Sequence, residues 1–271
     1  MKSIRICAAA LAATTLLALS QAMAAAQPST SAGGANPNAP ERSPPITLNL
    51  PNAIPLESLR DAAEAGNVEA MNLLGVLYTL GTLVPRDYSL ALYWFQKAVD
   101  GGSDDAMNNL GTIYLFGIGV SHDYVSALRW YERSAARGNA HSMYSVAVMA
   151  DKGLGTARDL RLARAMYLKA AEAGFAPAML QVSDDYARRS ASKHDLVEAY
   201  AWLQVAWQAG LPEELQIAAL ARREDLEVRL GPARRDAARA RAAQLAALVK
   251  SRVLPSEGKA PTPPQQAKGM I

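Results

Sequence analysis

Apolar and small residues recur along this chain with a period of 36 residues. Five glycines follow one another at that interval: Gly66, Gly102, Gly138, Gly174 and Gly210. Methionine recurs in step at Met71, Met107, Met143 and Met179. A fixed period of this length is the signature of a repeat architecture, in which each unit buries its apolar face against its neighbours. The pattern divides the chain into four units: 67–102, 103–138, 139–174 and 175–210.

The first half of each unit has the apolar spacing of a helix. Ala70, Leu74 and Leu77 lie three or four residues apart and therefore share one helix face. Gly81 predicts the end of this helix, because glycine is common just past a helix C-terminus. Gly75 lies mid-helix, where glycine costs up to ~1 kcal/mol relative to alanine. Its equivalents are Gly111, Ala147 and Ser183. These small residues predict a close approach of the second helix.

The second half of each unit predicts a second helix that begins after an aspartate. Asp87 and its equivalents Asp123 and Asp159 precede the apolar pattern and are expected to be N-caps. In the fourth unit, Asp195 and Glu198 have the spacing of a capping box. The buried face is predicted to contain Tyr88, Ala91, Phe95 and Ala98. The tryptophans recur at helical spacing, which favours core packing over ligand stacking: Trp94, Trp130 and Trp202.

Residues 1–24 have the composition of a signal peptide. A short basic start precedes the apolar run Ala8–Leu19, and Ala22-Met23-Ala24 provides a cleavage site. The alternative is a membrane anchor, but the run is shorter than the ~18–20 residues that a transmembrane helix needs. We therefore expect a periplasmic or secreted protein.

The other segments outside the repeats are predicted to be either disordered or helical caps. Residues 25–54 and 254–271 are rich in Pro, Ser and small polar residues and are predicted to be disordered. Residues 55–66 align with a second helix only and predict an N-terminal half-repeat cap. Residues 211–253 predict a C-terminal cap of two Arg-rich helices, Pro212–Arg229 and Pro232–Val253.

The charge of the chain gives no reason to expect nucleic acid as a partner. The formal net charge is +3, and Lys2 and Arg5 of the predicted signal peptide supply two of these charges. The arginines of the fourth unit and the C-terminal cap alternate with acidic residues, which favours a solvated, salt-bridged face. They are Arg188, Arg189, Arg222, Arg223, Arg234, Arg235, Arg239 and Arg241.

The second unit resembles a known repeat. Its stretch 106–138, AMNNLGTIYLFGIGVSHDYVSALRWYERSAARG, is similar to the Sel-one-like repeat (SLR), a relative of the tetratricopeptide repeat. The resemblance covers 67–210 and is weakest in the fourth unit. It implies an all-α solenoid of stacked antiparallel helix pairs that acts as an adaptor for proteins or peptides. Some exported, cysteine-rich members have been linked to penicillin binding, whereas the one cysteine here, Cys7, lies in the predicted signal peptide.

Residues with reactive or metal-binding side chains do not assemble into a recognisable catalytic or metal motif. His122 and His194 occupy the same loop position two units apart, too far apart to share a zinc ion, and His141 lies alone. Ser190 and Lys193 have the S-x-x-K spacing of penicillin-recognising enzymes, but the accompanying Lys-Thr-Gly motif is absent. We therefore predict no catalytic residues, no cofactor and no metal.

The first-helix positions outside the core pattern are the best candidates for binding. By analogy with tetratricopeptide stacks, these positions line a groove in which asparagines pair with an extended peptide above an apolar floor. The predicted partner-binding residues are Asn72, Leu73, Val76, Leu80, Asn108, Asn109, Thr112, Phe116 and Tyr144. An ordinary mixed surface is the alternative interpretation of these positions.

We therefore predict a non-catalytic periplasmic or secreted scaffold that binds a protein or peptide in this groove. The functional alternatives are a penicillin-binding or cell-wall-active envelope protein, or a scaffold for polysaccharide machinery.

Overall fold

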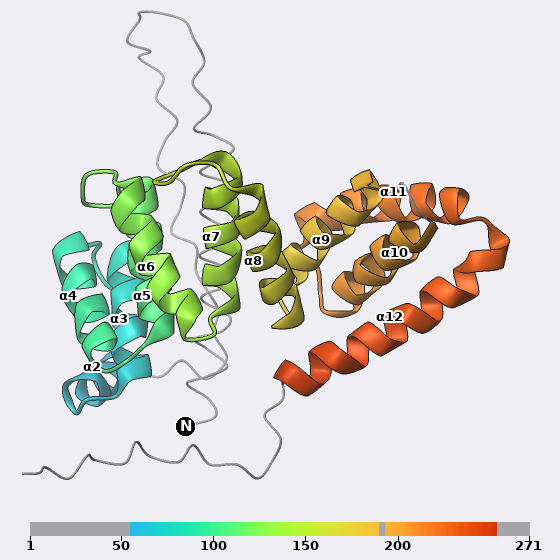
Figure 1. Cartoon of the computed structure of the whole chain (residues 1–271). Helices are drawn as coiled ribbons and strands as arrows, with labels where there is room; N and C mark the ends of the chain where they lie inside the picture. The colour runs from blue at the N-terminus through green and yellow to red at the C-terminus, as the bar shows by residue number, and fades with distance from the viewer. Residues whose placement is uncertain (1–54, 190–192, 254–271) are drawn as a thin grey trace, which may run out of the picture. The chain divides into compact units, whose positions relative to one another are not determined.

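The structure, a computed structural model, describes residues 55–189 and 193–253. In these residues the chain forms eleven α-helices and no strand (Figure 1). The predicted signal peptide, leader and C-terminal tail lie outside the described residues. The all-α class is confirmed. The contacts divide the chain into two compact units, which we call unit 1, ending at Arg137, and unit 2, beginning at Gly138.

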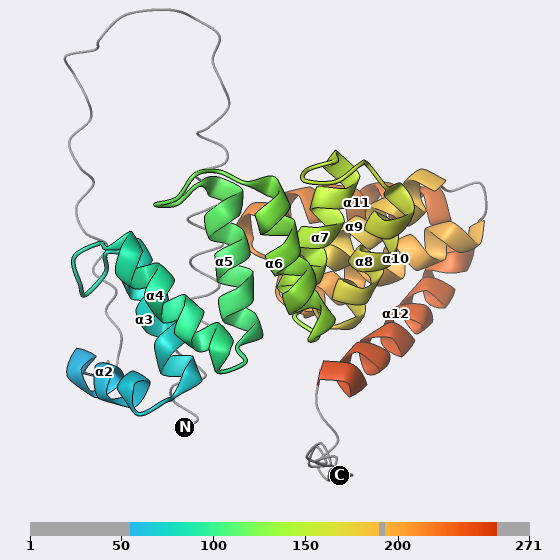
Figure 2. The ribbon, with the colours of Figure 1, turned by 60° about the vertical axis from the view of Figure 1, so that its left-hand side comes forward.

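Unit 1 consists of one single helix followed by two helix pairs. Helix α2 packs on α3, α3 pairs with α4, α4 packs on α5, and α5 pairs with α6 (Figures 1 and 2). The bounds are α2 Leu56–Glu64, α3 Val68–Leu80, α4 Tyr88–Asp100, α5 Asp104–Phe116 and α6 Tyr124–Ala136. Each pair corresponds to one predicted hairpin, so the helical pattern of the first two repeats is confirmed.

Unit 2 contains two further pairs and two longer helices. Helices α7 and α8 form one pair, α9 and α10 the next, and α12 runs beside α10 (Figures 1 and 2). The bounds are α7 Ala140–Lys152, α8 Leu160–Glu172, α9 Ala176–Arg189, α10 Lys193–Gln208, α11 Glu213–Leu230 and α12 Pro232–Val253. The last two helices coincide, within one residue, with those predicted after Gly210.

The predicted N-caps are present at the second helices of the first three repeats. The side chains of Asp87, Asp123 and Asp159 each accept hydrogen bonds from two backbone N–H groups of the following turn. First helices have caps that the sequence analysis did not identify: Asn67, Ser103 and Asn139 accept from the backbone N–H three residues later. Both helix types therefore begin at a side chain that satisfies otherwise unpaired donors.

The predicted capping box at Asp195 is wrong. Helix α10 begins at Lys193, so Asp195 lies inside its first turn and not ahead of it. Glu198 is buried at 5% exposure, and its carboxylate accepts from Arg241 of α12, with Nε at 2.6 Å and Nη2 at 3.3 Å. The Glu198 carboxylate therefore pairs with Arg241 of a distant helix and does not cap the N-terminus of α10.

The close helix approach predicted at Gly75 is confirmed. A Cβ atom on Gly75 would lie 2.6 Å from the ring of Phe95, and one on Gly111 would lie 2.7 Å from the ring of Tyr131. Phe95 and Tyr131 occupy the same position of consecutive repeats and are each 2% exposed. A small residue on the first helix thus makes room for an aromatic ring on the second.

The tryptophan positions are less uniform than predicted. Trp202 is buried at 3% exposure, but Trp94 and Trp130 are only half-buried. The guanidinium of Arg133 lies 4.5 Å from the centre of the Trp130 ring, which gives that ring a polar cover. Both half-buried tryptophans still pack against the core of unit 1, so the predicted core packing holds there at partial burial, while Phe95 and Tyr131 fill the space between the helices.

The loop between the two helices of a repeat adopts a left-handed conformation at its third residue. Gly119 and Gly155 have φ of 69° there, and Leu83 occupies the equivalent position with φ of 63°. A left-handed residue other than glycine costs roughly 1–2 kcal/mol. A Cβ on Gly119 would lie 2.3 Å from the Cβ of Tyr88, whereas the Leu83 side chain is 67% exposed. Leucine thus fits at one of these positions but not at the other.

The aspartate caps predict how the protein responds to acid. Hydrogen bonds from the Ser126 hydroxyl, and then from the backbone N–H groups of Ser126 and Val125, lower the pKa of Asp123 below its ordinary value. A lowered folded-state pKa contributes stability above the unfolded-state pKa near 3.9, and this contribution is lost as pH falls through the folded-state value. Asparagine also caps helices but does not titrate.

We expect Asp123→Asn to unfold much like the wild type at neutral pH, and to lose less stability between about pH 4 and pH 2. Urea denaturation across this pH range measures the difference. Adding Asp159→Asn should increase this difference in acid stability from the wild type, because the backbone N–H groups of Leu162 and Arg161 likewise lower the pKa of Asp159. Identical acid dependence in all three proteins would contradict the prediction.

Candidate functional site

The four polar residues of unit 1 predicted to bind a partner lie on its first helices. We call Asn72 of α3 and Asn108, Asn109 and Thr112 of α5 the amide strip; all four are half-buried. The side chain of Asn109 donates from Nδ2 to Oδ1 of Asn72 over 2.9 Å, which links the two repeats. An amide pair keeps further donor and acceptor capacity on both side chains, so this link is compatible with contacts to a ligand.

Thr112 links the amide strip to the core of unit 1. Its hydroxyl donates to the backbone carbonyl of Asn108 at 3.1 Å and lies 3.0 Å from the hydroxyl of Tyr131. Because the Tyr131 ring is held against Gly111, this contact fixes the Thr112 side chain from within the repeat. The strip is therefore supported by packed residues and has a defined geometry.

Two half-buried apolar side chains lie at the C-terminal ends of the same helices. Leu80 ends α3 and Phe116 ends α5, and each is followed by a left-handed glycine, Gly81 or Gly117. Leu80 also packs on the core of unit 1. The predicted apolar floor is thus reduced to these two positions.

Leu73 and Val76 are not available for the predicted role. Each is 6% exposed and belongs to the hydrophobic core of unit 1, together with Leu59 of α2. The physical reason is that α3 packs against both α2 and α4. A helix packed against two others exposes only a narrow strip, so their assignment to a surface groove is corrected here.

Tyr144, the last predicted binding residue, lies on α7 of unit 2 and packs in an aromatic cluster. The centre of its ring lies 5.4 Å from that of Tyr167 and 5.2 Å from that of Phe175. Burial raises the pKa of the Tyr144 phenol above its usual value. These contacts make Tyr144 a packing residue of unit 2, and Leu180, its equivalent in the next repeat, is 3% exposed.

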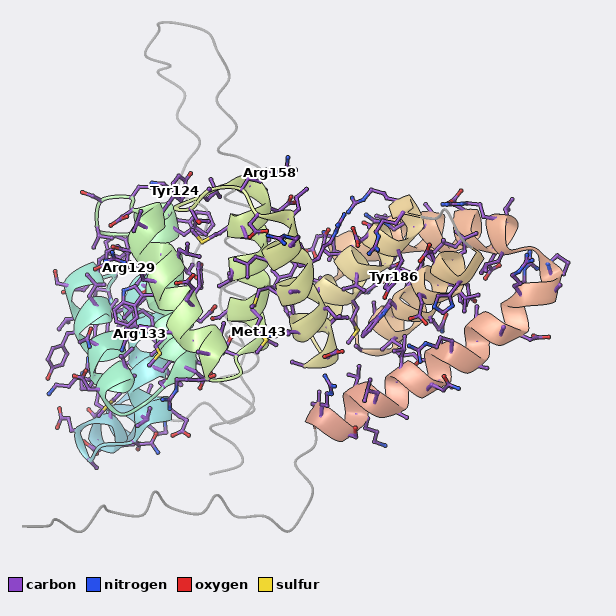
Figure 3. All side chains as sticks on the ribbon, in the orientation of Figure 1. Tyr124, Arg129, Arg133, Met143, Arg158 and Tyr186 are labelled. Atoms are coloured by element: carbon purple, nitrogen blue, oxygen red, sulfur yellow. The ribbon has the colours of Figure 1, made fainter. Side chains whose placement is uncertain are left out.

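The sequence analysis did not identify a basic cavity in unit 2. This cavity of about 440 Å³ is bounded by the end of α7, the start of α8 and one face of α9. Figure 3 shows Arg158 just ahead of the first turn of α8. The lining residues are Asp151, Arg158, Leu160, Ala163, Arg164, Tyr167, Gln181, Asp185, Arg188 and Arg189. Its arginines come from three segments of the chain, so no short sequence motif predicts the cavity.

The arginines of the fourth repeat and the C-terminal helices mostly form ion pairs, as predicted. Arg222 pairs with Asp184 at 2.8 Å, which joins α11 to α9. Further pairs join Arg189 to Asp185, Arg223 to Glu227, Arg239 to Asp236 and Arg241 to Glu198. The polar residues that weaken the repeat pattern in the fourth unit therefore have a structural role.

The other reactive side chains remain scattered. Nowhere in residues 55–189 and 193–253 do three metal-binding side chains come together. His122 packs edge-on against Tyr124, and His141 packs against Phe175. The Ser190–Lys193 motif falls outside the described residues, apart from the backbone of Lys193. Within the described part of the chain, no helix has the length and apolar character needed to cross a membrane.

Stacked antiparallel helix pairs with a 36-residue period define a helical-repeat solenoid protein. A family model described as Sel1 repeat matches residues 68–103, 104–139, 140–175 and 176–211, more than half of the chain. The chain therefore belongs to the Sel1 repeat family, and the resemblance seen in the sequence is confirmed. Proteins of this family are generally non-catalytic scaffolds, and their repeats typically mediate protein–protein interactions.

Two solved structures show what this chain is similar to. A Sel1 repeat protein from Oxalobacter formigenes is 33% identical over 48% of this chain and 97% of its own, with a TM-score of 0.44. The protective antigen c5321 of uropathogenic Escherichia coli, which displays an SLR fold, is 25% identical with a TM-score of 0.59. That match covers 79% of this chain but only 45% of c5321. No curated protein sequence matches the chain.

Proposed function

We propose that this protein is a scaffold that binds an extended segment of a protein partner along the amide strip of unit 1. The observation that carries the proposal is the hydrogen bond between Asn109 and Asn72, which aligns amide groups of consecutive repeats on one face. Asparagine amides match the alternating donors and acceptors of an extended peptide backbone. Half-buried Phe116, which ends α5, offers an apolar contact for a partner side chain.

We further propose that the scaffold works in the periplasm or outside the cell. The support for this location is the sequence of residues 1–24, with its basic start, short apolar run and small-residue cleavage site. Fusing these residues to a reporter that is active only after export tests the location. A reporter that stays inactive would contradict it.

The double variant Asn108→Ala with Phe116→Ala tests the binding face. We expect its Tm to remain nearly unchanged, because both side chains are half-exposed, whereas capture of the partner should be lost. Peptides selected from a displayed library on the wild-type chain provide the ligand, and fluorescence anisotropy measures the affinity.

A matched control removes an aromatic and an amide from a second helix of the same unit. Tyr93→Ala with Gln96→Ala serves this purpose, because both residues are exposed on α4. This control should bind the selected peptides as the wild type does. If the strip variant binds equally well, or the α4 control loses binding to the same degree, the amide strip is not the binding face.

A further inference from the structure

The basic cavity of unit 2 carries more positive than negative charge. Four arginines line it, against two aspartates. Arg158 pairs with Asp151 at 3.5 Å, while Asp185 is shared between Arg164 at 3.0 Å and Arg189 at 3.4 Å. One carboxylate thus serves two guanidinium groups, so positive charge remains on this side of the cavity.

Arg188 is the remaining cation of the cavity. It is exposed on α9, and no hydrogen bond or ion pair joins it to another described residue. Arg188 also lines a second cavity, of about 450 Å³, whose other lining residues come from α9 and α11. There Arg222 is paired with Asp184 and Arg229 with Asp225, so the second cavity is internally balanced apart from Arg188. The first cavity, with four arginines to two aspartates, therefore has a larger excess of positive charge than the second, with three arginines to two.

The basic cavity also has an apolar part and an amide. Leu160 and Ala163 of α8 line it together with the ring of Tyr167, and Gln181 of α9 adds a neutral donor and acceptor. A small inorganic anion would leave this apolar surface without a contact. A peptide uses all of it, because carboxylates reach the arginines while a neighbouring apolar side chain covers Leu160.

We propose that this cavity binds an acidic peptide segment of a protein partner, with carboxylates on Arg188 and Arg164 and an apolar side chain on Leu160 and Tyr167. Arginine guanidinium groups match carboxylates geometrically and form charge-assisted hydrogen bonds with them. A ligand carboxylate can take over Arg164 while Asp185 keeps Arg189. This is a second site, in unit 2, and it does not depend on the amide strip.

Binding of labelled peptides to the full chain tests the proposal. The probes are a fluorescein-labelled peptide of alternating glutamate and leucine and the matched peptide with glutamine for glutamate. We expect the glutamate peptide to bind in low salt and to weaken as salt is added, since exposed charges are screened beyond ~10 Å at 0.1 M. The glutamine peptide should not bind. Equal binding of both peptides would overturn the proposal.

Variants of the cavity identify the residues involved. Arg188→Gln with Arg164→Gln should weaken binding of the glutamate peptide by about ten-fold or more, as loss of a hydrogen bond to a charged group predicts. Asp185→Asn should strengthen binding, because it removes the competing carboxylate. The control is Arg239→Gln, which removes an exposed positive charge from α12, and its affinity should stay within about two-fold of the wild type.

Three outcomes would overturn the assignment. An equal loss of binding in Arg239→Gln and in the cavity variant would mean general attraction to a basic surface. Displacement of the peptide by inorganic phosphate, at concentrations where acetate has no effect, would assign the site to phosphate-like anions. Loss of binding in Asn108→Ala with Phe116→Ala would place the peptide on the amide strip instead. Circular dichroism confirms that each variant is folded.

Discussion

Replacing Phe95 by alanine is expected to lower the free energy of unfolding by about 3–5 kcal/mol. Phe95 is 2% exposed, and its ring fills the space that Gly75 leaves between α3 and α4. The substitution removes the buried ring and leaves a cavity that rigid helices cannot close. Urea denaturation of the full chain measures the loss. Trp130→Ala is the comparison, and it should cost less because Trp130 is only half-buried.

A second substitution tests whether the loss of stability depends on the close approach of α3 and α4 at Gly75. In the wild type, Gly75→Ala should destabilise, because its Cβ would lie 2.6 Å from the Phe95 ring. In the Phe95→Ala background, the same change should stabilise, since it adds a methyl group to an empty space and improves helix propensity. An effect of the same sign in both backgrounds would contradict the idea that the glycine and the ring are fitted to each other.

Replacing Arg241 by alanine is expected to cost roughly 2–3 kcal/mol, since it leaves a buried carboxylate without its partner. The Glu198 side chain is 7% exposed and that of Arg241 is 39% exposed, so solvent reaches one end of the pair and moderates the loss. The pair joins α10 to α12, and the C-terminal helix should loosen with it. Hydrogen exchange of α12 amides reports this local opening.

The matched control for Arg241 lies on the same helix. Arg239→Ala removes an arginine that is 65% exposed and pairs with an Asp236 that is 93% exposed, so its cost should be close to zero. If both variants lose the same stability, the effect reflects the charge or helix propensity of α12. A large loss in Arg241→Ala alone would instead identify the buried pair as its cause.

The fold was predictable from the sequence because the same spacing recurs four times. A single Gly75 or Asp87 is ambiguous, but its recurrence at intervals of 36 residues ties it to one position of a helix pair. Local chemistry then fixed the helix ends, since aspartate caps and left-handed glycines act within one turn. Asp195 is not an N-cap because α10 begins at Lys193, and Glu198, the other half of the supposed capping box, pairs with the distant Arg241.

The candidate sites were harder to predict because they depend on packing between elements. The spacing within α3 does not reveal that Leu73 and Val76 join Leu59 of α2 in one buried cluster. The amide strip itself was predicted as a set of positions, but its hydrogen bond between Asn72 and Asn109 joins residues 37 positions apart. The arginines of the basic cavity come from α8, α9 and the loop before α8, so only their arrangement in space makes it a site.

The loop residue Leu83 has a consequence for lengthening the array. Gly119 packs against Tyr88 of the preceding repeat. In a tandem duplication of residues 103–138, both copies would have a glycine at this position, so no side chain there would collide with the preceding repeat. In a duplication of residues 67–102, the new copy would bring Leu83, and its side chain would collide with the preceding copy of Tyr88. We therefore expect the array to tolerate a duplication of the second repeat but not a duplication of the first.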